Sequence, residues 1–364
     1  MRSVSRWCTL GLFAFVVALI AQNPAKLAAQ PKIEPDKVQI RTSDGLDLYA
    51  YWFTGEKASD VIVMMPAPGS KVNDTWMDLA RSAAEKKFAV LLFDWRGCGM
   101  NAGTGRIFNN KEIFYREFYN RGTPADAADK GLTYAKLPNK DFILNDLCGA
   151  RFFLEKKNDE KSCNVNRVWF VTEKESCNLA MAFVAAEFYR NSFYADNVVG
   201  VLGMGGAKAK QQLAGIDYAG AIFLSYARHA TAGNIFNTAP RANKKDLDRH
   251  LTDNMAIVSI TNKAEKTQPG SAFIHTFVKP DEKVMKDKFK YIKEFEDKGA
   301  MKVRTGIDLI DEKDSLGVKE YVLKALEEIR KVQAAGKTND DRNVKAVSSP
   351  PRFNLGKPQI ETLQ

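Results

Sequence analysis

The sequence predicts a single α/β domain, with a mostly parallel, twisted β-sheet, helices on both faces and an N-terminal antiparallel hairpin. Short, continuous apolar runs alternate with amphipathic segments along the 364-residue chain, which is typical of parallel strands that are buried on both faces. Two segments of alternating apolar and polar residues precede these runs, with a turn between them. Hydrophobic residues make up 45% of the chain and charged residues 27%, so the composition is that of a globular protein with a full core.

The predicted elements follow from these patterns in chain order. The hairpin comprises residues 38–42 and 46–52 around the turn residues Ser43, Asp44 and Gly45. The apolar runs predict parallel strands over residues 60–65, 88–94, 167–171, 219–224, 256–260 and 301–304. Amphipathic or Ala-rich segments predict helices over residues 75–86, 141–157, 178–193, 284–298 and 318–332.

Both ends of the chain differ from this body, which spans residues 31–333. Residues 1–30 place Arg2 and Arg6 before a thirteen-residue apolar run, which predicts a secretory signal peptide. The alternative is an uncleaved membrane anchor, although that run is shorter than the ~20 residues of a spanning helix. Residues 334–364 are polar and without apolar period, which predicts a disordered tail. Residues 101–140 form an aromatic-rich insert for which we predict either a ligand pocket or a satellite core.

The charge and cysteine content exclude several kinds of partner. The net charge is +10, but residues 1–30 and 331–364 each contribute +3, so the body carries only +4, distributed as mixed charges. We therefore expect no nucleic-acid binding. The cysteines lack metal-binding spacing, so we expect no metal site. Disulfides and buried free thiols both remain open for the four cysteines of the body, which are Cys98, Cys148, Cys163 and Cys177.

Four places in the sequence carry a resemblance to a known family. Residues 61–70, VIVMMPAPGS, look like the third strand and oxyanion loop of α/β-hydrolases, the superfamily that contains serine esterases and peptidases. Residues 88–99, FAVLLFDWRGCG, are similar to the fourth-strand signature of that family, and the helix and strand of residues 141–171 lead to its nucleophile elbow. The resemblance covers about residues 38–332 and implies an α/β-hydrolase fold.

The same resemblance implies that the catalytic triad has been lost. The elbow motif G-x-S-x-G is replaced by Thr172-Glu173-Lys174-Glu175-Ser176, which places Lys174 at the nucleophile position. Glu265 stands at the position of the acid, and Thr305, followed by Gly306, at the position of the base histidine. An ammonium is neither a nucleophile nor a partner for a general base. We expect Lys174 and Glu265 to form an ion pair in place of the triad.

Two alternative interpretations keep a reactive group at the elbow, residues 172–176. Shifting the elbow by two residues would make Ser176 the nucleophile of an active esterase or peptidase. Alternatively, Lys174 could act as a Schiff-base amine if its pKa were lowered. The oxyanion region would comprise Ala67, Gly69 and Glu175, weakened because Pro66 and Pro68 have no N–H to donate. The histidines, His229, His250 and His275, lie away from the end of the last predicted strand.

Together these observations predict an exported, secreted or periplasmic protein with an α/β-hydrolase fold that is catalytically inactive. We expect it to bind a small molecule or a protein partner, without a cofactor and without stable membrane insertion after removal of the signal peptide.

Overall fold

The computed structural model describes residues 33–42, 46–102, 144–184, 187, 214–226, 255–265, 292–296, 303–310, 315–335, 351–354 and 359–362. The predicted signal peptide, nearly all of the aromatic-rich insert and the three histidines lie outside these residues. Residues 1–34 and 35–364 form separate units, and the described helices and strands all belong to the second unit. None of the helices in the described part of the chain is both long and apolar enough to cross a membrane.

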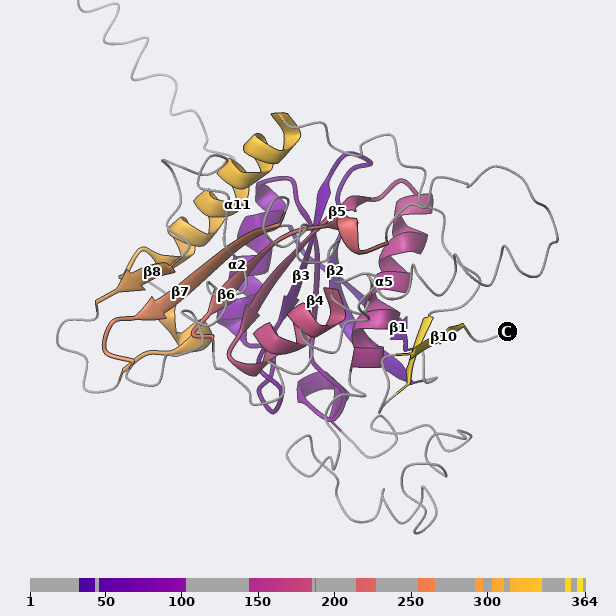
Figure 1. Ribbon diagram of the computed structural model, residues 1–364, viewed down its shortest axis with the longest axis horizontal. Helices are drawn as coiled ribbons and strands as arrows, with labels where there is room; N and C mark the ends of the chain where they lie inside the picture. The colour runs from indigo at the N-terminus through magenta and orange to yellow at the C-terminus, as the bar shows by residue number, and fades with distance from the viewer. Residues whose placement is uncertain are drawn as a thin grey trace, which may run out of the picture. The chain divides into compact units, whose positions relative to one another are not determined.

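An eight-stranded mixed sheet organises the domain, in the order β1-β2-β4-β3-β5-β6-β7-β8 (Figure 1). β2 pairs antiparallel with β1 and β4, and the remaining pairs are parallel. The fold class predicted from the sequence is confirmed. The strands are β1 (Asp36–Arg41), β2 (Asp47–Phe53), β3 (Asp60–Met65), β4 (Ala89–Phe93), β5 (Asn164–Glu173), β6 (Tyr218–Leu224), β7 (Ala256–Asn262) and β8 (Ile292–Phe295).

Helices cover both faces of this sheet (Figure 1). The helices are α2 (Asp74–Glu85), α5 (Leu144–Asp159), the segment 175–184 and α11 (Val318–Ala335), with short 3₁₀ turns at η1 (Gly99–Asn101), η5 (Ala214–Asp217) and η6 (Gly306–Leu309). α5 and the helix 175–184 share one apolar core with alternate residues of β3 and β5, such as Val61, Val63 and Phe170. α11 contacts α2, and the Lys319 ammonium of α11 pairs with the Asp78 carboxylate of α2 at 2.5 Å.

The structure corrects the last strand. The strand predicted at residues 301–304 is absent from the described residues 303 and 304, and β8 lies instead within the segment predicted as a helix over residues 284–298. β8 pairs in parallel with β7, and the Phe295 ring packs edge-on against Tyr321 of α11 at 5.8 Å. Ile292 and Phe295 are three residues apart, as on a helix face, but main-chain pairing with the open edge of β7 overrides that local pattern.

The C-terminal segment also differs from its prediction. Within the tail predicted to be disordered, β9 (Pro351–Asn354) and β10 (Gln359–Thr362) pair antiparallel as a separate two-stranded sheet. The helix before the tail extends to Ala335, two residues beyond the predicted end of the domain.

The signature Asp94-Trp95-Arg96-Gly97-Cys98-Gly99 forms the turn after β4, and the contacts within this turn account for its residue types. The Asp94 carboxylate accepts hydrogen bonds from the N–H groups of Val72 and Met100, at 2.6 and 2.9 Å. Gly99 has a φ of +48°, and a Cβ there would lie 2.1 Å from an oxygen of Asp94, so only glycine fits. The Arg96 guanidinium crosses to α5 and pairs with Asp146 at 2.6 Å, with neither side chain exposed.

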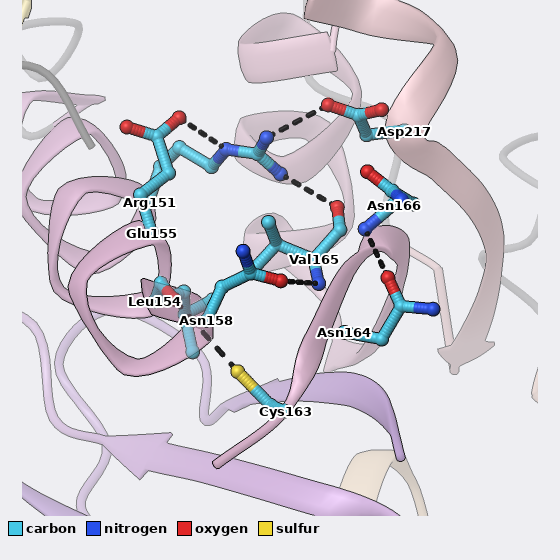
Figure 2. A network of polar contacts seen from close by, with 9 residues as sticks. All are labelled: Arg151, Leu154, Glu155, Asn158, Cys163, Asn164, Val165, Asn166 and Asp217. Carbon is cyan, nitrogen blue, oxygen red and sulfur yellow. Dashed lines mark hydrogen bonds and ion pairs between the residues drawn. The ribbon is translucent and has the colours of Figure 1, made fainter. Parts of the chain in front are cut away.

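A second buried ionic network lies where β5 and β6 begin (Figure 2). The Arg151 guanidinium of α5 donates to Glu155 at 2.9 Å, to Asp217 at 2.7 Å and to the Val165 carbonyl at 3.2 Å. It therefore ties α5 to the second residue of β5 and to Asp217, the residue immediately before β6. Because the sheet is parallel here, this network holds the edge opposite to the one where β5 and β6 end.

Candidate functional site at the carboxyl edge of β5, β6 and β7

Lys174 forms a tight strand-to-helix turn. It follows the last residue of β5, and residues 175–184 are helical immediately after it. Its backbone is left-handed, with a φ of +47°, which is uncommon for a residue other than glycine and is found at strained functional turns. Its N–H donates to the Leu224 carbonyl at the end of β6 at 3.0 Å, and its carbonyl accepts from the Cys177 N–H at 3.3 Å. The half-buried Lys174 side chain therefore starts from the apex of an elbow.

Replacing Lys174 by glycine tests this strain. Glycine adopts a left-handed backbone at no steric cost, so Lys174→Gly should raise the free energy of unfolding by up to about 1 kcal/mol. Lys174→Ala keeps the Cβ, and is expected to be no more stable than the native chain. Urea denaturation of the three proteins measures the difference. Equal stability of the glycine and alanine variants would contradict a strained elbow.

Glu173 connects three loops beneath the elbow. Its carboxylate is 2% exposed and accepts hydrogen bonds from the Ala67 N–H at 2.9 Å and the Ile307 N–H at 2.7 Å. Ala67 lies in the loop after β3, and Ile307 lies in η6. A buried carboxylate that accepts main-chain N–H groups is held firmly, because charged hydrogen bonds are the stronger kind. The turn after β5, the loop after β3 and η6 are thereby fixed to one another.

Gly306, which follows Thr305 at the position that the resemblance assigns to the base, lies beside the elbow. A Cβ built on Gly306, whose φ is +61°, would lie 2.1 Å from Oε2 of Glu173 and 3.0 Å from Cε of Lys174. The lysine stem thus runs along a position that must be glycine. Thr305 is half-buried and precedes η6 as its N-cap, without a capping side-chain hydrogen bond.

Ser176, the alternative nucleophile, is fully buried in the first turn of the helix that follows the elbow. Its hydroxyl donates to the carbonyl of Pro66 and accepts a hydrogen bond from the indole N–H of Trp95 at 2.9 Å. The same indole N–H also lies 2.9 Å from the Pro66 carbonyl. The Ser176 hydroxyl proton is therefore directed at a main-chain carbonyl, which is not a base that could accept it.

The amides predicted for an oxyanion hole are engaged inside the protein. The Ala67 N–H donates to Glu173, and the Gly69 N–H donates to the Cys98 sulfur at 3.2 Å. Glu175 is half-buried and is the first helical residue after the elbow. Two of the three predicted groups thus have acceptors that belong to the chain itself.

Glu265 does not pair with Lys174, so the predicted ion pair is wrong. Within the part of the chain that the structure describes, the carboxylate of Glu265 accepts from the hydroxyls of Ser225 at 2.9 Å and Thr261 at 3.2 Å, and no ion pair of Lys174 occurs. Ser225 follows β6 directly, and its N–H donates to the Ile260 carbonyl of β7 at 2.8 Å. Two hydroxyls rather than an ammonium therefore hold this carboxylate.

The four cysteines of the body are free and buried. Of the two possibilities that the sequence left open, disulfides and buried free thiols, the structure shows free thiols. Burial raises the pKa of the Cys98 thiol to about 11 and that of Cys163 to about 12. Burial also raises the pKa of Cys177, whose sulfur accepts from the Thr172 hydroxyl at 3.3 Å. These thiols are protonated at neutral pH, so they are packing groups rather than nucleophiles.

The strand order and the position of the left-handed turn define the fold. A sheet that begins with an antiparallel hairpin continues as parallel strands, and the left-handed turn lies between the fifth strand and a helix. The chain has an α/β-hydrolase fold.

Within the described residues, no group of three or more His, Cys, Asp or Glu side chains could hold a metal ion.

Comparisons with known proteins are limited to distant structures. No protein-family model and no curated protein sequence match the chain. Among solved structures, it is similar to esterase Pf2001 of Pyrococcus furiosus, with 11% identity and a TM-score of 0.42 over 82% of this chain and 91% of that one. It is also similar to a phosphonate-inhibited esterase B of Lactobacillus rhamnosis, with 8% identity and a TM-score of 0.47 over 92% of this chain and 99% of that one. At sequence identities this low, neither the substrate nor the mechanism of these esterases can be assigned to this chain.

Two residues of this site were missed by the sequence analysis. One is Glu173, although a carboxylate at the buried end of a strand signals an internal partner, because buried charges need one. Ser225 was overlooked because it lies one residue beyond the apolar run of β6 and belongs to no motif. Its left-handed backbone, with a φ of +50°, has no sequence signature.

Proposed function

We propose that this protein binds a ligand at the carboxyl edge of β5, β6 and β7 and does not hydrolyse esters by the serine–histidine mechanism of its fold family. The observation that carries this proposal is the position of Lys174 at the apex of the left-handed elbow. A nucleophile in that position needs a hydroxyl or thiol that passes its proton to a neighbouring base, and an ammonium cannot do this.

The surrounding hydrogen bonds support a loss of the family's mechanism. The amide of Ala67 is occupied by Glu173 and that of Gly69 by Cys98, so these donors are not free to stabilise a developing oxyanion. The Ser176 hydroxyl donates to the Pro66 carbonyl and accepts from the Trp95 indole, so neither partner is a base for its proton, which argues against it as the substitute nucleophile of an active hydrolase.

We further propose that the protein is exported, secreted or periplasmic, on the basis of residues 1–30 alone. Mass spectrometry of the mature protein from its native host measures where the chain begins. Retention of the apolar segment in a membrane fraction would favour the uncleaved anchor instead.

The proposed function predicts no steady-state esterase activity. With p-nitrophenyl butyrate as substrate, the native chain and Ser176→Ala should release nitrophenol at equal rates. After any initial stoichiometric release, both rates should equal the rate of hydrolysis in buffer alone. Multiple turnovers by the native chain would overturn the proposal. Labelling of Ser176 by a fluorophosphonate, lost in Ser176→Ala, would establish the hydrolase alternative in its place.

Binding is tested separately by thermal unfolding in the presence of a fixed set of short carboxylic acids, esters and amides. A compound present at 100 times its Kd should add about 2.7 kcal/mol to the free energy of unfolding. We expect at least one compound to raise the Tm of the native chain and not that of Lys174→Met. If every compound acts equally on both proteins, the elbow is not the binding site.

A further inference from the structure

Ser225 repeats the geometry of the elbow one strand further along the sheet. Lys174 and Ser225 each follow the last residue of a parallel strand, and each has a left-handed backbone, with φ of +47° and +50°. Each N–H donates to a carbonyl near the end of the neighbouring strand, from Lys174 to Leu224 at 3.0 Å and from Ser225 to Ile260 at 2.8 Å. A left-handed backbone is strained for a serine, as it is for a lysine. Ser225 therefore shares the backbone conformation of Lys174 but carries a hydroxyl instead of an ammonium.

The neighbours of Ser225 are those that a nucleophilic hydroxyl requires. Its Oγ donates to the Glu265 carboxylate at 2.9 Å, within the range in which a general base takes a proton. The Thr261 hydroxyl donates to the same carboxylate oxygen at 3.2 Å. Because Glu173 pairs with Leu224 in the parallel register, Lys174 and Ser225 follow adjacent positions on strands that lie about 4.8 Å apart.

We propose that Ser225 is a covalent acceptor for an activated acyl group, with Glu265 as its general base. The Ser225 oxygen attacks the acyl carbon of an aryl ester or thioester, the hydroxyl proton passes to Glu265, and the bond to the leaving group breaks. Glu265 then returns the proton to the leaving group, so the products are an acyl-Ser225 ester and a free phenol or thiol. A cation at position 174 would stabilise the negative charge that develops on the acyl oxygen.

The weak base and the burial of Ser225 determine which ligands react and what becomes of the acyl-serine ester. A carboxylate is a weak base towards a serine hydroxyl, so only ligands with good leaving groups should react. Because Ser225 is 1% exposed, we expect only small acyl groups to reach it, and exclusion of bulk water slows hydrolysis of the ester once it has formed. The inference deepens the proposed function, on which it rests, because it makes binding at this edge covalent and stoichiometric rather than catalytic.

The test is acetylation of the full chain by p-nitrophenyl acetate, followed by intact-mass spectrometry and peptide mapping. We expect one acetyl group per chain, located on Ser225. Ser225→Gly should abolish it and still fold, because glycine suits the left-handed backbone. Glu265→Gln keeps an acceptor for the Ser225 hydroxyl but loses the base, and should slow acetylation by about 100-fold or more. Ser315→Ala, an exposed serine elsewhere, is the matched control and should react as the native chain does.

The possible failures are distinguishable. Undiminished acetylation in Ser225→Gly, acetylation confined to lysines or Ser176, or none at all would overturn the inference while leaving ligand binding intact. Continuous release of nitrophenol beyond one equivalent would instead overturn the proposed function, because the protein would then be an enzyme.

Discussion

Asp146→Ala should lower the free energy of unfolding by about 3–5 kcal/mol, because it leaves a buried arginine without its counter-ion. The Asp146 carboxylate accepts from Nε, Nη2 and the main-chain N–H of Arg96, at 2.8, 2.6 and 3.1 Å. Neither side chain of the pair is exposed. A guanidinium that loses this partner stays desolvated and uncompensated, so the loss exceeds that of an ordinary hydrogen bond.

Urea denaturation measures this change, and Asp47→Ala is the matched control. Asp47 also pairs with an arginine, Arg41, at 2.7 Å, but the two side chains are 48% and 55% exposed. Removing an exposed partner should cost no more than about 1 kcal/mol. If Asp146→Ala costs as little as Asp47→Ala, the Arg96–Asp146 pair does not hold the turn after β4 to α5.

Glu173→Ala should lower the free energy of unfolding by about 2–5 kcal/mol, since the main-chain N–H groups of Ala67 and Ile307 would both lose their acceptor in a buried place. The effect should be local as well as global. Amide hydrogen exchange at Ala67 and Ile307 is expected to accelerate more than exchange in β3 or β5, because the carboxylate is what fixes those two loops to the elbow.

The control for this variant is Glu175→Ala, which removes an equal charge two residues away. Glu175 is half-buried, and its carboxylate makes no side-chain hydrogen bond with another described residue, so its loss should change stability by less than about 0.5 kcal/mol. Comparable losses for both variants would show that the charge near the elbow matters and the hydrogen bonds of Glu173 do not.

Most strands were predictable because burial on both faces leaves a continuous apolar run. The runs at residues 60–65, 219–224 and 256–260 coincide with β3, β6 and β7 to within two residues. β8 was not predictable in this way. It has only four residues, two of them charged, and its pairing with β7 is a long-range main-chain interaction that leaves no local pattern.

The candidate site was predictable only in part. Motif order placed Lys174 at the elbow, and the structure finds it there in a left-handed turn. The partner of Glu265 was not predictable, because Ser225 and Glu265 lie forty positions apart and meet only when β6 and β7 pair. Opposite charges at two triad positions suggested an ion pair, but hydroxyls nearer to Glu265 satisfy its carboxylate instead.

Apolar periodicity and turn residues, which act over a few neighbouring positions, by themselves determined the α/β class and the hairpin, whereas Lys174 was expected at the elbow only from the resemblance to α/β-hydrolases. The tertiary structure alone decided which polar groups meet at the carboxyl edge of the sheet. There Glu173 engages the amides of Ala67 and Ile307, and Glu265 engages Ser225. The physical reason is that buried polar groups take whichever partner the packed strands bring within hydrogen-bonding distance, and that partner depends on strand order and register rather than on separation in the chain.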